Sequence, residues 1–358
     1  AKDAGRPGPV RPSKGDPIMR SLACLLALAA VLGTDVSARA QEKKILVDGR
    51  RADLVEELKG ASPLARIVPV TPETVMQEIG DADAFIGRIT PEHVRAGKRL
   101  KWVGSMSAGV EWVLHLSGGT DLRDSDIVLT NNQIVQGPEI ADHAMAMLLT
   151  LSRDIDRFLE DKRQRQWRPR PYPGIELNGR TAVVLGVGGI GTQVAFRAWA
   201  HGMRVVGVDP EDIPYMPVVD TVVKPDQLND VLPSADVVFM TAPHTPESHK
   251  MMGAEQFALM KKGAYFIAVS RGKTYDLDAL TEAVQSGHLA GAGVDVTDPE
   301  PLPENHPLWA CENVVITPHV AGRSDKDRAR MVGTLVENIR RFVEGRPLLN
   351  VVDKAKGY

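Results

Sequence analysis

The chain has 358 residues, of which 43% are hydrophobic and 25% are charged, and its formal net charge is −3. A chain of this length can bury a large core and most naturally makes two domains. Its balanced charge excludes the basic surface that nucleic-acid binding requires. The two cysteines, Cys24 and Cys311, and the nine histidines show no metal-ligand spacing, so we expect no metal site.

The first 40 residues contain three parts in the order typical of an export signal. Met19 and Arg20 precede an apolar run over 22–32, which is too short to span a bilayer as a helix. Small residues in the Ala-Arg-Ala sequence at 38–40 then suit a signal peptidase. We therefore predict an upstream tail followed by a signal peptide over 19–40. The protein would be periplasmic or secreted, with no membrane segment after removal of the signal. The alternatives are a buried N-terminal helix and a wrongly assigned start in a cytoplasmic enzyme.

Strands and helices then alternate along the first half of the chain. Short apolar runs predict strands at 44–47, 84–86 and 102–104, and a polar helix is expected over 52–59. A longer helix is predicted from apolar residues at helical spacing, which are Ile140, Ala144, Met147, Leu148, Leu151, Ile155 and Phe158. The prolines of RQWRPRPYPG end this helix and make a linker.

Beyond the linker, near-continuous apolar runs alternate with helical stretches. The runs predict strands at 181–185, 204–208, 237–241, 264–269, 291–295 and 314–317. Such strands form a parallel sheet that is covered on both faces, so the fold class is α/β. A last helix is expected over 324–344, with Ser324 as its cap and Gly345 and Pro347 after its end.

The first functional pattern is GVGGIG, which directly follows the strand predicted at 181–185. In a strand–turn–helix, Gly186 permits a tight turn, Gly188 lets a pyrophosphate approach the backbone, and Gly191 allows close packing. Asp209 ends the next strand, where a carboxylate accepts hydrogen bonds from an adenosine ribose and repels a 2′-phosphate. The pattern predicts NAD rather than NADP; a glycine turn without a ligand is the alternative.

Four polar residues fall at or beyond the carboxyl ends of predicted strands, and they are Arg271, Asp295, Glu300 and His319. Ligands of open parallel sheets bind at this edge. Taken singly, each residue has an ordinary structural explanation, such as a surface ion pair for an arginine or a hydrogen-bonded structural role for a histidine. Their shared position above one cofactor edge predicts a reaction centre.

The second half resembles the D-isomer-specific 2-hydroxyacid dehydrogenase family in IELNGRTAVVLGVGGIG, TAPHTPES, VSRGKTYDLDAL, GAGVDVTDPEPLPENHPLW and ITPHVAG. In the first half, LKWVGSMSAGVEWV and IADHAMAMLLTLSR agree with the same family. The resemblance implies two Rossmann-like doubly wound parallel-sheet domains. A discontinuous substrate-side domain would comprise 41–139 and 320–350, and an NAD-binding domain with a linking helix would comprise 140–319. The family also implies a homodimer.

The resemblance further implies roles for individual residues. Arg271 would bind the substrate carboxylate and carbonyl oxygen, His319 would donate or accept the proton, and Glu300 would pair with His319. The backbone loop that would bind the substrate carboxylate comprises Ser107, Ala108 and Gly109. The implied cofactor-binding residues are Gly186, Gly188, Gly189, Ile190, Gly191, Asp209, Ala242, Pro243 and, at the nicotinamide end, Asp295.

These residue types suit the reduction of a 2-keto acid. An imidazole titrates near neutral pH, a paired carboxylate raises the imidazole pKa, and a guanidinium fork binds a carboxylate. We expect an NAD(H)-dependent oxidoreductase that interconverts a small 2-keto acid and its D-2-hydroxy acid, similar to glyoxylate and hydroxypyruvate reductases. A non-catalytic NAD-sensing or protein-interaction module on the same fold is the alternative.

Several positions depart from the family pattern or leave the substrate open. The departures are Ala268 for Asn, Glu111 for Asp, Asp142 for Glu and Tyr275 for Val. None belongs to the expected proton-transfer pair, although Ala268 is expected to affect how the Arg271 loop is held. The substrate side chain is expected near Arg88, Met106 and Trp167, where Arg88 either binds an anionic group or forms a surface ion pair.

Overall fold

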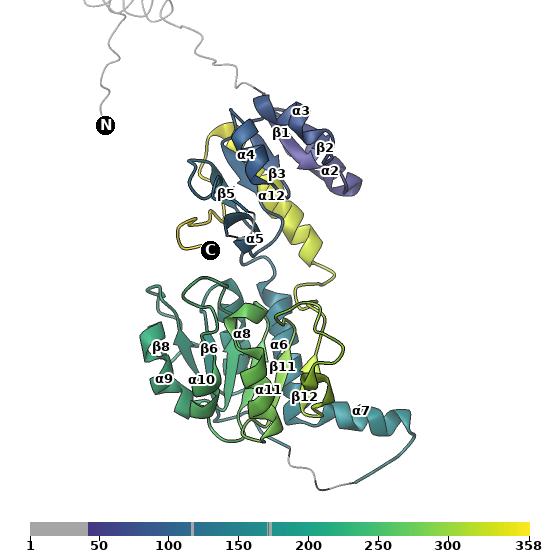
Figure 1. Ribbon diagram of the computed structural model, residues 1–358, viewed down its shortest axis with the longest axis vertical. Helices are drawn as coiled ribbons and strands as arrows, with labels where there is room; N and C mark the ends of the chain where they lie inside the picture. Colours follow the sequence, from purple (N-terminus) through teal and green to yellow (C-terminus); the bar gives the residue numbers. More distant parts are fainter. Residues whose placement is uncertain (1–41, 116–117, 170, 172–173) are drawn as a thin grey trace, which may run out of the picture. The chain divides into compact units, whose positions relative to one another are not determined.

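The computed structural model of the protein describes residues 42–115, 118–169, 171 and 174–358 (Figure 1). The predicted tail and signal peptide lie outside the described residues. Two parallel sheets form the framework of the described part, one with five strands and one with seven. Among the described helices, none has both the length and the apolar character needed to cross a membrane.

The first sheet has the strand order β2-β1-β3-β4-β5, and all neighbours are parallel. Its strands are β1 (Lys43–Asp48), β2 (Ala65–Val70), β3 (Ala84–Ile86), β4 (Trp102–Gly104) and β5 (Val128–Thr130). The helices beside it are α2 (Ala52–Lys59), α3 (Val75–Glu78), α4 (Pro91–Ala96), α5 (Glu111–Leu114) and α12 (Asp327–Glu344).

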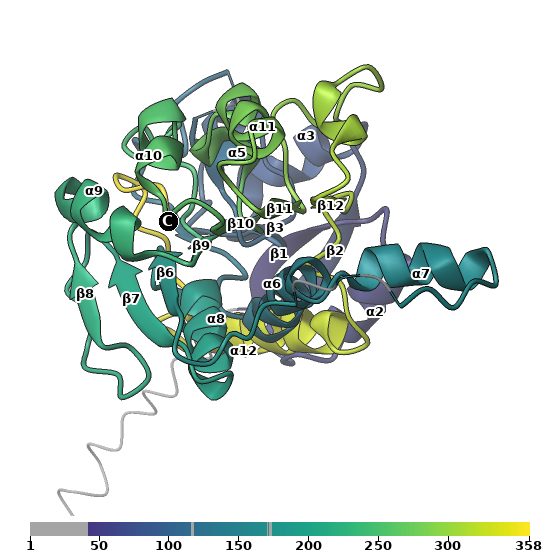
Figure 2. The same ribbon diagram turned by 90° about the horizontal axis from the view of Figure 1, so that it is seen from below.

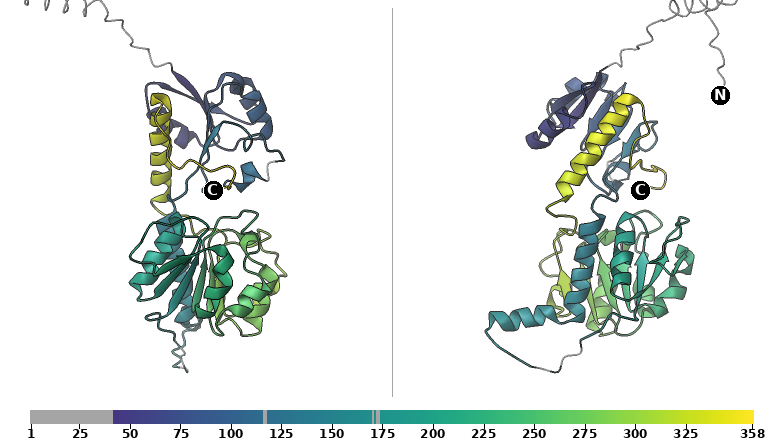
Figure 3. Two further views of the ribbon diagram at one scale, coloured as in Figure 1. Left: turned by 90° about the vertical axis from the view of Figure 1, so that its left-hand side faces the viewer. Right: turned by 180° about the vertical axis from the view of Figure 1, so that it is seen from behind.

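Helices α2 and α12 cover one face of the first sheet, although α12 comes from the other end of the described chain (Figure 3). Ile45 and Val47 of β1 pack on this face with Leu335 of α12. Leu46 lies between them in sequence and packs in the core of the opposite face. Because successive side chains of a strand point to opposite faces, a continuous apolar run makes a strand that is buried on both.

The second sheet has the order β12-β11-β10-β9-β6-β7-β8 and is also parallel throughout. Its strands are β6 (Thr181–Leu185), β7 (Arg204–Val208), β8 (Thr221–Val223), β9 (Val237–Met240), β10 (Tyr265–Ala268), β11 (Gly291–Val294) and β12 (Val314–Ile316). Its helices are α6 (Gly137–Ser152), α7 (Ile155–Arg163), α8 (Gly189–Ala200), α9 (Leu228–Val231), α10 (Ala254–Leu259) and α11 (Leu277–Gln285). Short 3₁₀ turns are η1 (Ile79–Asp81), η2 (Pro225–Gln227), η3 (Leu232–Ser234), η4 (Gly272–Thr274) and η5 (Pro307–Ala310).

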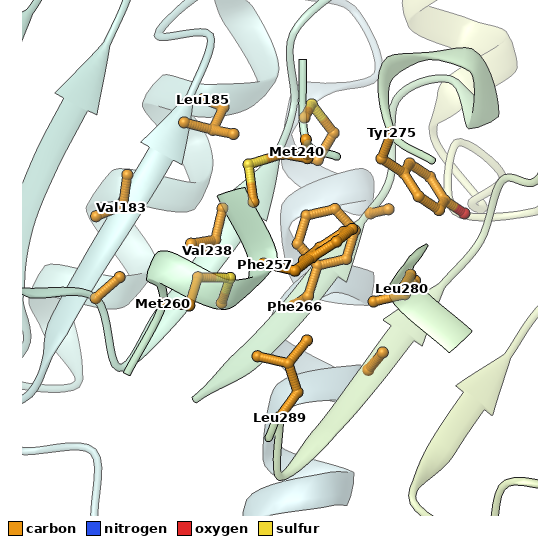
Figure 4. Packing of buried hydrophobic residues seen from close by; sticks show 14 of the residues in the cluster. Val183, Leu185, Val238, Met240, Phe257, Met260, Phe266, Tyr275, Leu280 and Leu289 are labelled. Carbon is orange, nitrogen blue, oxygen red and sulfur yellow. The ribbon is translucent and has the colours of Figure 1, made fainter. Parts of the chain in front are cut away.

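Helices cover both faces of this second sheet. The neighbouring helices α6 and α8 lie on one face (Figure 2), and α10 and α11 lie on the other. We call the core between the second sheet and helices α10 and α11 the second core, and Figure 4 shows it. In it, the ring of Phe266 of β10 packs edge-on against Phe257 of α10 at 5.1 Å and against Tyr275 at 5.3 Å between ring centres. Aromatic pairs in this arrangement add packing energy to the burial of their surface. They fix the strand ends from which the polar residues of the site emerge.

The two parallel sheets confirm the predicted α/β class. The domain boundaries at 139/140 and 319/320 stay predictions. The last helix begins at Asp327 instead of Ser324, although Ser324 Oγ accepts the backbone N–H of Asp327 at 3.0 Å as a cap would. Gly345, with φ +69°, follows its last residue, as expected of a helix C-terminus.

The single long helix predicted from Ile140 to Phe158 is wrong. Helix α6 ends at Ser152, Asp154 adopts a left-handed conformation with φ +48°, and α7 begins at Ile155. The turn changes the direction of the chain, so Ile155 and Phe158 are exposed instead of continuing the buried stripe of α6. The apolar spacing runs across this break, and neither glycine nor proline marks it in the sequence.

Strands β2, β5 and β8 were not predicted. All of them lie at sheet edges, β2 and β5 at the two edges of the first sheet and β8 at one edge of the second. Each contains partly or fully exposed positions. An edge strand packs against fewer neighbours, so its apolar signal is weaker than that of a central strand.

Candidate active site

The glycine loop joins β6 to α8 at the carboxyl edge of the second sheet. Gly186 has φ +86°, and a Cβ there would lie 2.6 Å from the Cα of Ala242, so the turn requires glycine. A Cβ on Gly191 would lie 1.9 Å from the carbonyl oxygen of Gly186. Gly188 is exposed, and no atom lies within 4 Å of the position of its missing Cβ. The loop therefore fits a pyrophosphate at the N-terminus of α8.

The other predicted loop residues lie around this turn. Gly189 opens α8 and packs so closely on Ile134 that a Cβ would lie 2.7 Å from the Ile134 Cα. Ile190 packs partly buried against the core beneath α8. Pro243 follows Ala242 after β9, and its carbonyl accepts a hydrogen bond from Ser248 Oγ at 2.6 Å. These contacts build the floor and one side of the glycine loop.

Asp209 lies directly beside the glycine loop, at the end of β7. Its Oδ2 accepts the backbone N–H of Val187 at 2.7 Å, and its Oδ1 accepts that of Glu211 at 2.9 Å. The residue is only 7% exposed. The two hydrogen bonds hold the carboxylate at the place where the sequence predicts the adenosine ribose of NAD.

His319 and Glu300 form a hydrogen-bonded pair beyond the ends of β12 and β11. The distance from His319 Nδ1 to Glu300 Oε2 is 2.9 Å, and Glu300 Oε1 accepts the backbone N–H of Thr297 at 3.1 Å. The hydrogen bond that His319 donates to Glu300 raises the pKa of His319 above its ordinary value. Burial opposes the charge of Glu300, but its contacts with His319 and Thr297 outweigh burial and lower the Glu300 pKa. Both shifts favour an imidazolium–carboxylate pair.

Asp295 organises the loop that presents His319. Its buried carboxylate accepts Thr317 Oγ1 at 2.6 Å and the backbone N–H groups of Val320 and Ala321 at 2.9 and 3.0 Å. His319 itself has φ +53°, and its N–H donates to the carbonyl oxygen of Asp295 at 2.8 Å. The left-handed conformation is unfavourable for a residue with a Cβ, so these contacts are needed to hold it. Asp295 thus lies under the loop that carries His319. Its contact with the nicotinamide end of the cofactor stays a prediction.

His143 of α6 belongs to the same network and was missed in the sequence. Its Nε2 lies 2.9 Å from Thr317 Oγ1 and 3.7 Å from Asp295 Oδ1. The signal that could have found it is a histidine among the apolar positions of a helix predicted to pack on the sheet. His143 connects the linking helix to the loop that carries His319.

Arg271 follows β10 and reaches residues of the first sheet. Its Nε donates to Glu111 Oε1 at 2.6 Å, and its Nη1 donates to the carbonyl oxygen of Ser270 at 2.8 Å. A Cβ on Gly109 would lie 1.7 Å from Arg271 Nη2, so a larger residue at position 109 would displace the guanidinium from this place. The structure thus brings the predicted arginine to the predicted loop. Glu111, noted in the sequence only as a departure, is the partner that holds it.

The loop over Ser107, Ala108 and Gly109 is held from below by two asparagines that the sequence reasoning missed. Asn131 Nδ2 donates to the carbonyl oxygen of Ala108 at 2.7 Å, and Asn132 N–H donates to that of Ser107 at 3.1 Å. Both asparagines directly follow β5. The strand-end rule that found Arg271 and His319 would have found them if β5 had been predicted.

A pocket of about 180 Å³ lies beside these groups. It is lined by Glu111, His244, Arg271, Gly272, Lys273, Thr297, Asp298 and Glu300. Burial, together with electrostatic interactions with His249 and Lys273, lowers the pKa of His244. All of these residues except Gly272 have polar or charged side chains, which suits a small charged ligand. Among the described residues, no group of three or more His, Cys, Asp or Glu is arranged to hold a metal ion.

The remaining departures and substrate-side residues lie in different surroundings. Ala268 and Tyr275 are buried in the second core, and Tyr275 Oη donates to the carbonyl oxygen of Val296. The Arg88 guanidinium lies 5.5 Å from the ring centre of Trp112, whose Nε1 donates to the Gly109 carbonyl oxygen at 3.1 Å. Arg88 therefore makes a cation–π contact beside the 107–109 loop, and both the anion-binding role and the surface ion pair stay predictions.

Met106, Asp142 and Trp167 complete the positions that the sequence singled out. Met106 packs partly buried against the core under α12. Asp142 of α6 pairs with Arg197 of α8, with its Oδ1 2.6 Å from Arg197 Nε. Trp167 lies beyond α7 and is 96% exposed. The helix pair α6 and α8 is thus joined by an ion pair outside the polar pocket.

Fold and site together define a two-sheet α/β protein with a dinucleotide-binding loop beside a histidine–carboxylate pair and an arginine. Comparison with known proteins agrees with this class. The model of the "D-isomer specific 2-hydroxyacid dehydrogenase, NAD binding domain" family matches residues 145–321. A solved family protein from Aeromonas salmonicida is 31% identical, with a TM-score of 0.74, and covers 88% of this chain and 100% of its own.

Two curated relatives extend the match. A D-3-phosphoglycerate dehydrogenase from Methanocaldococcus jannaschii is 32% identical over 87% of this chain, which spans only 59% of that protein. A glyoxylate reductase from Korarchaeum cryptofilum is 33% identical, with 80% of this chain and 87% of that protein covered. The chain therefore belongs to the D-isomer specific 2-hydroxyacid dehydrogenase family and contains its NAD-binding domain. This confirms the resemblance read from the sequence.

Proposed function

We propose that the chain is an NAD(H)-dependent oxidoreductase that interconverts a small 2-keto acid and its D-2-hydroxy acid, in the manner of glyoxylate and hydroxypyruvate reductases. The observation that carries this proposal is the 2.9 Å pair of His319 and Glu300 next to the pocket that Arg271 lines. A proton donor and a carboxylate-binding cation are the two protein groups that keto-acid reduction needs. The glyoxylate reductase among the relatives supports the same substrate class.

His319 would handle the proton at Nε2, because its Nδ1 faces Glu300. The raised pKa keeps the imidazole protonated to a higher pH, so it can donate to the carbonyl oxygen of a keto acid. In the reverse direction, the neutral imidazole accepts the proton of the hydroxyl group. Glu300 stabilises the imidazolium that is the reactant of one direction and the product of the other.

Arg271 would bind the substrate carboxylate through the edge of its guanidinium that Glu111 leaves available. Glu111 occupies Nε and Ser270 occupies Nη1, whereas Nη2 lies against Gly109. The loop backbone at Gly109 and the guanidinium would thus contact the same carboxylate. A charge-assisted contact from Nη2, combined with backbone N–H donors of the loop, fixes both the position and the orientation of a small acid.

The cofactor site would be formed by the glycine loop and Asp209. When bound, the nicotinamide supplies or accepts the hydride that the protein side chains cannot carry. The loop from Gly186 to Gly191 would bind the pyrophosphate with backbone N–H groups, and Asp209 would accept the ribose hydroxyls. The Asp209 carboxylate would repel a 2′-phosphate, which favours NAD over NADP.

The test is a panel of keto acids with NADH and the chain from residue 41 onward. Glyoxylate, hydroxypyruvate and pyruvate are offered in turn, and consumption of NADH is followed by absorbance. The proposal expects turnover with at least one of them and its loss in His319→Ala. NADH binding without turnover on any 2-keto acid would instead support the non-catalytic alternative.

We also propose that two copies associate through the side of the second sheet that carries α7 and α8. Large apolar side chains are exposed there, namely Ile155, Phe158, Leu159, Phe196 and Trp199. Exposed apolar patches of this kind favour binding of a protein partner, and the family resemblance implies that this partner is a second copy of the chain. Light scattering on the purified chain tests this, because a monomer that persists at high concentration would refute it.

For localisation, the export-signal pattern over 19–40 supports a periplasmic or secreted protein, with the cytoplasm as the alternative. Mass spectrometry of the mature N-terminus in a cell fraction tests it. A chain that begins after residue 40 and occurs outside the cytoplasm is the expected result. An uncleaved chain in the cytoplasmic fraction would contradict it.

A further inference from the structure

The segment after α12 ends in a short turn that is fixed to the first sheet. Val352 is buried in the core of that sheet, and its N–H donates to the carbonyl oxygen of Leu129 at 2.8 Å. Lys354 Nζ donates to the carbonyl oxygens of Leu122, Ser125 and Ile127. Burial lowers the pKa of Lys354. We call residues 353–358 the C-terminal hook.

The hook has a defined shape. Asp353 Oδ1 accepts the N–H groups of Ala355 and Lys356 at 3.0 and 3.1 Å, and the Gly357 N–H donates to the Asp353 carbonyl oxygen at 2.8 Å. Gly357 is buried with φ +85°, and a Cβ there would lie 3.1 Å from His115 Nε2. A turn with these bonds places its side chains reproducibly.

The tip of the hook contacts Glu211, which follows β7 of the second sheet. Lys356 Nζ and Tyr358 Oη lie 2.6 and 2.9 Å from the same oxygen, Glu211 Oε1. The hydrogen bonds from Lys356 and Tyr358 lower the pKa of Glu211, which is therefore a carboxylate at neutral pH. We call each sheet with its helices a lobe. The hook is anchored in the lobe of the first sheet, and its Lys356 and Tyr358 side chains contact the segment that follows β7 in the other lobe.

Glu211 is connected to the predicted cofactor site by two further hydrogen bonds. Its N–H donates to Asp209 Oδ1, and Asp209 Oδ2 accepts the N–H of Val187 in the glycine loop. Hook, Glu211, Asp209 and glycine loop therefore form one continuous hydrogen-bonded chain. The charge of Glu211 would add to that of Asp209 near an anionic cofactor, and Lys356 compensates it.

We propose that the C-terminal hook is part of the cofactor site: Lys356 and Tyr358 fix Glu211 and close the adenosine end of the NAD groove from the opposite lobe. The proposal rests on the cofactor site assigned under the proposed function. Because the hook belongs to the first sheet and Glu211 to the second, the contact ties the two lobes together at that end. A bound dinucleotide would dissociate only after this contact opens, so the hook slows cofactor release.

The test measures NADH binding to the chain from residue 41 onward and to its Lys356→Met/Tyr358→Phe double variant. Loss of the two contacts to one carboxylate is expected to raise the NADH Kd about five- to tenfold, mainly through faster dissociation in stopped-flow fluorescence. The single variant Lys356→Arg keeps the positive charge and leaves Tyr358 in place, so its NADH Kd is expected to equal that of the wild type.

Lys59→Met is the matched control, because Lys59 forms an exposed ion pair of 2.6 Å with Glu56 on α2 and loses the same charge. Its NADH Kd is expected to equal that of the wild type. Equal NADH dissociation rates in the double variant and the wild type would overturn the hook proposal, even if the melting temperature fell. Absence of NADH binding in the wild type would instead overturn the proposed function, so the two failures are distinguishable.

Discussion

Strands β1 and β6 are the first strands of their sheets along the chain, and each is followed by a turn and a helix. Only the turn after β6 suits a dinucleotide. After β1, the Arg50 side chain folds back on Asp48, with Arg50 Nε 2.9 Å from Asp48 Oδ1. The hydrogen bond from Arg50 lowers the pKa of Asp48, which keeps a negative charge in this turn. After β6, no atom of the described residues lies within 4 Å of the position of a Cβ on Gly188, so there is open space beside the backbone.

The contrast shows that parallel topology alone does not make a cofactor site. Both turns precede a helix, so both have the N–H donors and the positive end of a helix dipole. The difference lies in side chains: the Asp48–Arg50 ion pair occupies the turn after β1, whereas an exposed glycine, Gly188, leaves open space in the turn after β6. The first sheet contributes instead a loop after β4, whose Gly109 admits the guanidinium of Arg271. One sheet would thus bind the nucleotide, and the other would bind the acid.

The largest expected effect comes from removing the proton donor while the glycine loop stays intact. His319→Ala is expected to lower kcat/KM for a 2-keto acid about 10²- to 10⁴-fold, since a positioned acid contributes that much to a proton transfer. The NADH Kd is expected to stay unchanged. Steady-state kinetics and fluorescence titration measure the two quantities. His201→Gln, an exposed histidine at the end of α8, is the control and is expected to keep full activity.

The next effect tests the open space at the glycine loop directly. Gly188 has φ −74° and open surroundings, so Gly188→Ala is expected to fold normally. Its methyl group would fill the space that a pyrophosphate needs, and the NADH Kd is expected to rise about tenfold or more. Isothermal titration measures this.

Gly333→Ala is the control for Gly188→Ala, because Gly333 lies in α12 and also has no atom within 4 Å of a Cβ. It is expected to stabilise the chain by about 0.5–1 kcal/mol and to leave NADH affinity unchanged. If Gly188→Ala bound NADH as tightly as Gly333→Ala, the contrast between the two turns would lose its functional meaning.

A smaller effect concerns the pH dependence of the proton donor. In the proposed mechanism, reduction requires the imidazolium of His319, so the rate is expected to fall as pH rises through the His319 pKa, which Glu300 raises. Glu300→Gln removes the charge that favours the imidazolium. The alkaline limb of kcat/KM is therefore expected to move to lower pH. A fall in rate with an unmoved limb would show that Glu300 only positions the ring.

Local patterns in the sequence were sufficient for the central strands and for the polar residues that follow them. Arg271 and His319 were found because a buried apolar run shows where each strand ends, and the carboxyl edge of a parallel sheet is where ligands bind. The glycine loop was found from residue spacing, because its conformation depends on glycine itself. The class of fold and the main site candidates therefore depend on local signals.

Contacts between distant segments could not be read in this way. Arg271 and Glu111 are 160 positions apart, and Lys356 and Glu211 are 145 apart. No local pattern reports which two loops meet when two sheets are brought together. The break at Asp154 was missed for a related reason, because a left-handed residue without glycine leaves no compositional signal.

The smallest effect tests which carboxylate near the adenosine ribose sets the choice of cofactor. Asp209→Asn removes a charge but keeps the shape, so the ratio of kcat/KM with NADPH to that with NADH is expected to rise about tenfold. The amide nitrogen must then face the N–H of Val187 or of Glu211, which is expected to lower the melting temperature as well. Asp212→Asn removes the same charge three residues later from a fully exposed carboxylate paired with Lys224. Water screens that carboxylate, so the cofactor ratio is expected to stay near that of the wild type; an equal rise in both variants would mean that overall charge, and not Asp209, selects NAD.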